Sequence, residues 1–166
     1  MSVRVQPSGT HLIEVRLRPE FVDAEGAGAL ALLRAQGQTS LRDARISRLF
    51  EIKGPLTVNQ VQQAAKDLLC DAVTQEFRMI SPTAAAMNGM NSWRVEVWPR
   101  ATVADPVGET VRAAIADMGL PRPDSVRCAL AYRLSGRATK PALERAVSKS
   151  LANPLIHNAV VTESHP

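Results

Sequence analysis

The chain has 166 residues, of which 45% are hydrophobic, 22% charged and only 4% aromatic. This balance is typical of a folded globular protein with an aliphatic core, and it excludes extended disorder. No stretch approaches the roughly 18 apolar residues of a membrane span, and no apolar signal-peptide segment opens the chain. The net charge of +4 is mild, and the densest basic spot is 42–48, so we expect neither a nucleic-acid nor a membrane partner. With only two cysteines a disulfide framework cannot form, and we expect reduced thiols and a cytoplasmic location.

An internal repeat organises the sequence, because a shift of 82 positions aligns it with itself without a gap. The identities fall on turn and cap positions: Asp23 on Asp105, Gly26 on Gly108, Gly37 on Gly119, Gly54 on Gly136, Thr57 on Thr139, and Arg18 on Arg100. The small and polar segment 81–92 lies between the copies and is predicted to be a linker. We therefore expect two repeats, 1–80 and 93–166.

The first half of each repeat predicts a strand followed by a helix. Apolar and polar residues alternate over 12–18 and 92–98, which is the pattern of a half-buried strand. Asp23 and Asp105 are suitable helix N-caps, since a carboxylate accepts the free N–H groups of the first turn. Gly37 and Gly119 are predicted to end the two helices in the left-handed conformation.

The second half of each repeat predicts a strand, a helix and a last strand. The extended stretches are 44–54 and 126–136, the first being one bent strand or two short ones with a bulge near Ser47. Helices are predicted to begin at Thr57 and Thr139, and final strands to cover 72–79 and 154–161. The sequence thus predicts an α+β fold of two ferredoxin-like β-α-β(β)-α-β repeats. We expect antiparallel sheets with the helices on one face, packed as an intramolecular pseudo-dimer.

The second sheet face of the second repeat is expected to be apolar. Its predicted residues are Trp98, Ala129, Ala131, Ile156 and Val160. Because an apolar face of this size is rarely left in water, we expect the other repeat or a partner chain to cover it.

The sequence motifs predict no catalytic residue, no cofactor and no metal site. The three histidines and two cysteines do not have the spacing of metal ligands. Cys70 and Cys128 lie neither at a helix N-terminus nor in a glycine-flanked nucleophile turn, so nothing activates their thiols. Gly26 is interpreted as a packing glycine, with anion binding at the helix start as the alternative. Arg45 and Arg127 align across the repeats; they bind a phosphate or carboxylate, or they pair with acidic neighbours, and both interpretations stay open.

Four sequence patterns resemble PurS, the small subunit of phosphoribosylformylglycinamidine synthase. They are, in 12–54, a V-x-L-x-P strand, a D-x-x-G helix start and a strand like V-R-x-G-K. The stretch 105–161 matches better and ends with L-A-N-P-x-I, the most specific piece. Ser47 and Ala129 depart from the pattern, since the family tends to have Gly at that position. The resemblance spans nearly the whole chain as two PurS-like units.

The resemblance implies a non-catalytic subunit of a glutamine-dependent, ATP-using ligase of purine biosynthesis. PurS forms dimers and bridges the synthetase and glutaminase subunits, and in large single-chain versions two PurS-like halves replace the dimer. Further dimerisation of this chain is an additional expectation. The candidate interface or anion contacts are Arg45, Arg127, Trp98 and Asn153.

Two alternative functions would each use particular residues of this sequence. A tandem ligand-sensing module of the ACT type would bind an amino acid near 23–26 or 105–108. An RNA-binding tandem would need aromatic stacking platforms, for which Phe50 and Tyr132 are the candidates, although both are expected to face inward.

Overall fold

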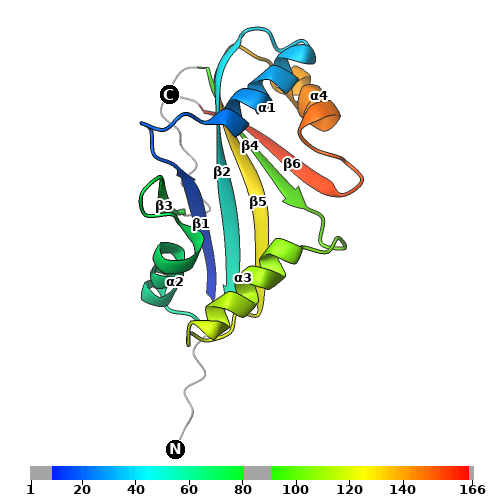
Figure 1. Cartoon of the computed structure of the whole chain (residues 1–166). Coiled ribbons are helices and arrows are strands. Elements are labelled where there is room, and N and C mark those ends of the chain that lie inside the picture. Colours follow the sequence, from blue (N-terminus) through cyan, green and yellow to red (C-terminus); the bar gives the residue numbers. More distant parts are fainter. Residues whose placement is uncertain (1–8, 81–90, 165–166) are drawn as a thin grey trace, which may run out of the picture. The chain divides into compact units, whose positions relative to one another are not determined.

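The computed structural model describes residues 9–80 and 91–164, in which eleven elements follow one another (Figure 1). They are β1 (Gly9–Leu17), α1 (Ala24–Ala35), β2 (Leu41–Gly54), α2 (Val58–Ala64), the π-helical turn η1 (Ala65–Leu69), β3 (Gln75–Ile80), β4 (Ser92–Pro99), α3 (Pro106–Asp117), β5 (Ser125–Gly136), α4 (Lys140–Ser150) and β6 (His157–Ser164). The strands form one six-stranded antiparallel sheet in the order β3-β1-β2-β5-β4-β6. The predicted α+β fold with two β-α-β repeats is confirmed.

Two compact units make up the described chain, and each takes segments from both halves of the sequence. The first unit comprises residues 9–18, 49–80 and 105–128, and the second comprises 19–48, 91–104 and 129–164. The first unit therefore contains α3 from the second repeat, and the second unit contains α1 from the first. The sequence repeats, with their boundaries at 80 and 93, remain a proposal about duplication. Most of the predicted linker lies outside the described residues.

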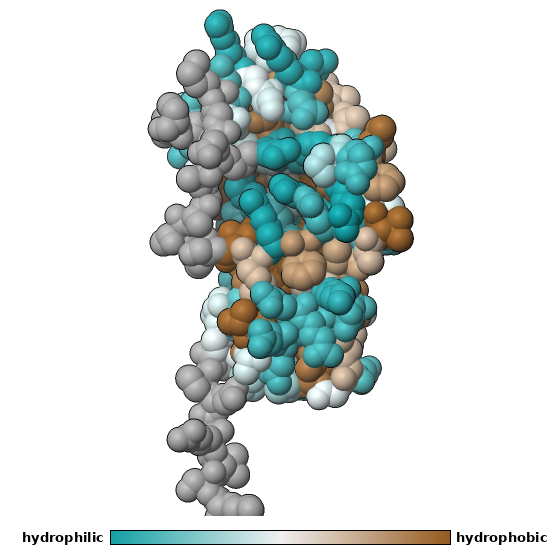
Figure 2. Space-filling model, turned by 90° about the vertical axis from the view of Figure 1, so that its left-hand side faces the viewer, coloured by the Kyte–Doolittle hydropathy of each residue, from teal (hydrophilic) through white to brown (hydrophobic). Residues whose placement is uncertain are grey.

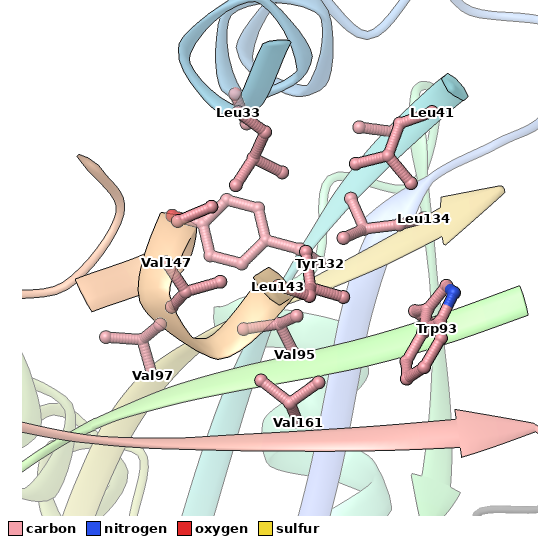
Figure 3. Packing of buried hydrophobic residues seen from close by; sticks show 13 residues of the cluster. Leu33, Leu41, Trp93, Val95, Val97, Tyr132, Leu134, Leu143, Val147 and Val161 are labelled. Carbon is pink, nitrogen blue, oxygen red and sulfur yellow. The ribbon is translucent and has the colours of Figure 1, made fainter. Parts of the chain in front are cut away.

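The core of the second unit forms where α1 and α4 lie side by side and cover strands of the sheet (Figures 1 and 3). Figure 3 shows its side chains gathered from six elements, namely Leu33 of α1, Leu41 of β2, Val95 and Val97 of β4, Tyr132 and Leu134 of β5, Leu143 and Val147 of α4, and Val161 of β6. Full burial of such aliphatic side chains stabilises the unit by about 1.5–3 kcal/mol each.

The core of the first unit is built from the same kinds of residues. Its buried members come from β1, β2, the β2–α2 loop, α2, η1, α3 and β5: Ile13, Val15, Phe50, Ile52, Leu56, Val61, Ala64, Ala65, Ile115 and Val126. Phe50 is the single aromatic ring among these buried residues, as the aromatic-poor composition predicts. Each unit thus has an aliphatic core of its own.

Several strand boundaries differ from those predicted, and one open choice is decided. β1 begins at Gly9 and β2 at Leu41, three residues earlier than predicted in each case. β3 begins at Gln75 and β6 at His157, three residues later than predicted, because a tight turn precedes each strand. β2 runs as a single strand from Leu41 to Gly54.

Charged residues on neighbouring strands of the first unit pair across the sheet. Glu14 lies opposite Arg78 and Arg16 opposite Glu76 in the β1–β3 register. Both pairs form ion pairs, of 2.6 Å and 2.7 Å, as opposite charges in facing positions favour. Figure 2 shows hydrophilic side chains over much of the described surface in this view, with hydrophobic residues in small groups.

Part of the predicted apolar face is buried, and its covering by the other repeat or by a partner chain stays a prediction. Ala129 and Ala131 of β5 are buried, whereas Ile156 and Val160 remain 41% and 50% exposed. Ile156 precedes the first residue of β6, so the strand alternation that predicted its position does not apply to it.

Candidate interaction site

One aspartate in each repeat joins the first helix to the following long strand. Asp23 accepts the backbone N–H of Gly26 through Oδ1 (2.8 Å) and that of Ile46 through Oδ2 (2.7 Å). Asp105 accepts the N–H of Gly108 and of Cys128 through the corresponding oxygens, both at 2.8 Å. The predicted N-caps are thus confirmed, and each also fixes the helix to a strand.

The glycine at each helix start is a packing glycine. A Cβ on Gly26 would collide with the carbonyl oxygen of Ala44, and one on Gly108 with that of Val126. The carboxylates of Asp23 and Asp105 already accept two N–H groups each. The helix starts are therefore filled by contacts within the chain, and they offer no open cradle for the amino acid that an ACT-type module would bind.

A second repeated feature is the turn before each last strand. In the first repeat, Oδ1 of Asp71 accepts the N–H groups of Val73 (2.8 Å) and Thr74 (3.0 Å), while the Asp71 N–H donates to Gln75 Oε1. In the second repeat, Oδ1 of Asn153 accepts the N–H of Leu155 (3.0 Å). The Asn153 N–H donates to Nδ1 of His157 (3.0 Å), so that ring nitrogen carries no proton in this arrangement. We call residues 71–75 and 153–157 the two Asx turns.

A repeated arginine anchors each Asx turn to the first strand of its repeat. Arg18 donates Nη2 to the carbonyl oxygen of Ala72 (3.1 Å). Arg100 donates both Nε (2.9 Å) and Nη2 (2.7 Å) to that of Pro154. The repeat alignment contains this signal, because it places Arg18 on Arg100, but the alignment alone assigns the pair no role.

Each Asx turn presents one apolar side chain to solvent. Val73 is 75% exposed and Leu155 is 83% exposed. They occupy the same position of the two turns, and both turns are held by side-chain hydrogen bonds. An exposed apolar residue on a rigid turn loses little conformational entropy on binding, which favours protein contact. The two Asx turns are the candidate interaction site.

The electrostatics of the two turns differ. The N–H groups of Thr74 and Val73 lower the pKa of Asp71, because they hydrogen-bond its charged form. Asn153 stands in the same position without a charge. Desolvation raises the pKa of the neighbouring Cys70 thiol, which keeps it protonated near neutral pH and poorly nucleophilic.

The four predicted contact residues are not gathered into one cluster. Arg45 lies in the second unit and donates to the Phe21 carbonyl oxygen (3.0 Å), whereas Arg127 lies in the first unit, 3.9 Å from Glu51. Trp98 is half-buried on β4, opposite Asn158 of β6. Only Asn153 belongs to the candidate interaction site, where its side chain shapes the turn.

Three further features concern RNA binding, metal binding and membrane spanning. Phe50 and Tyr132 are both buried in the cores, so neither ring offers a stacking platform to a base. Within residues 9–80 and 91–164, no three His, Cys, Asp or Glu side chains are grouped to hold a metal ion. Among the same residues, no helix has the length and apolarity that a membrane crossing requires.

Comparison with known families identifies the second half of the chain. Residues 92–164 match the family model described as PurS: Phosphoribosylformylglycinamidine (FGAM) synthase. No curated protein matches the chain significantly. The matched segment runs from the first residue of β4 to the last of β6, and so includes Asp105, Arg100 and the Asx turn at Asn153. Residues 92–164 therefore form a PurS-like unit.

Proposed function

We propose that this chain is a non-catalytic scaffold subunit of phosphoribosylformylglycinamidine synthase in purine biosynthesis, and that it bridges the synthetase and glutaminase subunits. The observation that carries the proposal is the match of residues 92–164 to the PurS family model. A role in FGAM synthase follows from the family, and the bridging role is our extension of it.

The repeated hydrogen bonds support a pair of PurS-like units in one chain. The bonds of Asp23, Arg18 and Asp71 recur 82 positions later at Asp105, Arg100 and Asn153. This agreement extends to residues outside the matched segment. We infer that the first repeat is a second PurS-like unit, so that one chain supplies what a dimer of single units supplies in the family.

The two Asx turns are the proposed contact surfaces for the partner subunits. They share geometry and an exposed apolar side chain, but differ in charge at Asp71 and Asn153. A difference of this kind favours different partners, because charge complementarity selects between otherwise similar surfaces. We propose that one turn contacts the synthetase and the other the glutaminase, with Trp98, Arg45 and Arg127 as secondary contacts.

Size-exclusion chromatography with purified synthetase and glutaminase subunits tests the bridging role. The two partners are expected to co-elute only when this chain is present. Leu155→Asp and Val73→Asp are each expected to remove one partner from the complex. Val107→Glu is the matched control, since Val107 is 57% exposed in the first turn of α3, where an acidic residue is tolerated. Co-elution of the partners without this chain, or equal loss with all three variants, contradicts the proposal.

A further inference from the structure

A polar pocket of about 650 Å³ lies within the second unit, where the α1–β2 loop meets the start of β4 and the end of β5. Three arginines line it: Arg34 from α1, Arg42 from β2 and Arg137 after β5. The rest of the lining consists chiefly of serine and threonine hydroxyls, one asparagine and backbone. The volume falls in the range of small-molecule sites.

No acidic residue in the lining balances the positive charge of the three arginines. Within the described residues, Arg42 and Arg137 have no carboxylate in ion-pair contact. Arg34 is held in place, because its Nε (3.0 Å) and Nη2 (2.7 Å) both donate to the Leu41 carbonyl oxygen. Fixing a guanidinium in this way reduces the entropy lost when it binds an anion.

The internal repeat supplies a comparison for the same position in the first unit. There, 82 positions away, Thr39 is replaced by Pro121, Arg42 by Asp124 and Arg137 by Pro55. The backbone arrangement is kept: a Cβ on Gly136 would collide with Leu41, and one on Gly54 with Pro123, the repeat equivalent of Leu41. The fold thus builds this position twice, but neither Arg42 nor Arg137 has a basic equivalent in the first unit, where Ser40 and Ser135 are replaced by Arg122 and Lys53. Folding of this position therefore does not require Arg42 and Arg137, whereas Arg112 donates to the Pro123 carbonyl oxygen of the first unit as Arg34 does to that of Leu41.

We propose that this pocket binds the phosphate group of a small phosphorylated metabolite. Guanidinium groups match phosphate oxygens in paired, charge-assisted hydrogen bonds, and serine and threonine hydroxyls supply further donors. No aromatic side chain lines the pocket, so recognition falls on the phosphate rather than on a stacked base. The inference concerns the second unit alone and holds whether or not the chain bridges enzyme subunits.

Isothermal titration calorimetry on the full chain, with three probes, tests the proposal. The probes are pyrophosphate, ribose 5-phosphate and ADP, and we expect binding of at least one. Arg42→Gln and Arg137→Gln are each expected to weaken it about tenfold, the effect of losing one charge-assisted hydrogen bond. Arg145→Gln is the matched control, since Arg145 is exposed on α4 outside the pocket; it should leave affinity unchanged.

Amide chemical shifts locate the bound probe. Addition of the binding probe should shift the N–H resonances of Ser40, Arg42 and Gly136, and leave those of the equivalent residues Arg122, Asp124 and Gly54 in place. The proposal is overturned if none of the probes binds at millimolar concentration. It is also overturned if Arg145→Gln weakens binding as much as Arg42→Gln, which would show a general attraction to basic surface.

Discussion

The carboxylates of Asp23 and Asp105, 82 positions apart, each cap a helix with one oxygen and accept a strand N–H with the other. The helix bond satisfies an N–H group that no intrahelical partner reaches. The strand bond secures the helix to the sheet. One short side chain therefore sets both the start and the docking of a helix, once in each unit.

Replacing either aspartate is expected to cost similar stability. Asp23→Ala and Asp105→Ala each lose a cap, worth about 1 kcal/mol, and leave a strand N–H unpaired, worth about 1–3 kcal/mol. We expect a loss of about 2–4 kcal/mol for each in urea unfolding. Asp117→Ala, at the exposed end of α3, should change stability by less than about 0.5 kcal/mol. A large loss for one aspartate alone would show that the two helices are not equivalent.

Two glycines in α1 should respond to alanine in opposite directions. Gly26→Ala introduces a methyl group into the Ala44 carbonyl oxygen and should destabilise the protein. At Gly28 nothing lies near the added carbon, so Gly28→Ala should stabilise it by about 0.5–1 kcal/mol through helix propensity. Thermal unfolding of both variants provides the comparison. Tolerance of Gly26→Ala without a fall in Tm would contradict the close packing of α1 against β2.

The Glu14–Arg78 and Glu25–Arg48 ion pairs should differ in how much they contribute to the free energy of unfolding, according to their burial. Glu14 has a side chain only 5% exposed and meets Arg78 at 2.6 Å, whereas Arg48 and Glu25 are both largely exposed and 3.4 Å apart. Arg78→Met is therefore expected to cost about 1–2 kcal/mol, and Arg48→Met less than about 0.5 kcal/mol. Chemical denaturation measures both changes. Equal effects would mean that burial of Glu14 does not strengthen the pair.

Tyr132 should make the protein sensitive to alkali. Desolvation, and secondarily the charge of Glu25, raises its pKa above the ordinary value of 10.0, partly opposed by Arg48. Because the folded-state pKa is the higher one, this contribution to stability is complete below pH 10 and is lost as the pH rises toward the folded-state value. As Tyr132 is the only tyrosine, tyrosinate absorbance reports it alone. Tyr132→Phe should remove both the absorbance change and this part of the alkaline loss.

Asp71 should make the first Asx turn sensitive to acid. Its pKa lies below the ordinary 3.8, so the stabilisation it provides is present above that value and is lost as the pH falls through the folded-state pKa. Asp71→Asn should therefore lower Tm more at neutral pH than under strongly acidic conditions. Asn153 already occupies the equivalent position, which shows that an amide fits the turn. A Tm difference independent of pH would contradict the role of the charge.

Much of the fold could be predicted from local patterns. The caps at Asp23, Thr57 and Thr139 are observed, as are the left-handed conformations of Gly37 and Gly119. Each of these depends on interactions within a few residues, which a sequence pattern records directly.

The composition of the compact units could not be predicted in the same way. β2 has 14 residues and β5 has 12, so at about 3.3 Å per residue each is far longer than the roughly 10 Å width of one helix. Each strand therefore contributes one part to each unit, and α1 and α3 join the unit made largely by the other repeat. Periodicity indicates which side of a helix is buried, but not which part of a long strand buries it.

The candidate sites could likewise be predicted from the sequence only in part. The alignment of Arg18 with Arg100 is visible in the sequence, but their role in holding the Asx turns needs the position of Ala72 and Pro154. Arg34 and Arg137 are about one hundred positions apart, and only the fold brings them to one pocket.

A reconstituted assay of glutamine-dependent amidine formation tests whether this chain joins the synthetase and glutaminase subunits. The synthetase and glutaminase subunits are held at fixed concentration while this chain is titrated in. The glutamine-dependent rate is expected to rise with added chain and then saturate, because the chain joins the two partners. An unchanged glutamine-dependent rate, with or without the chain, would contradict it.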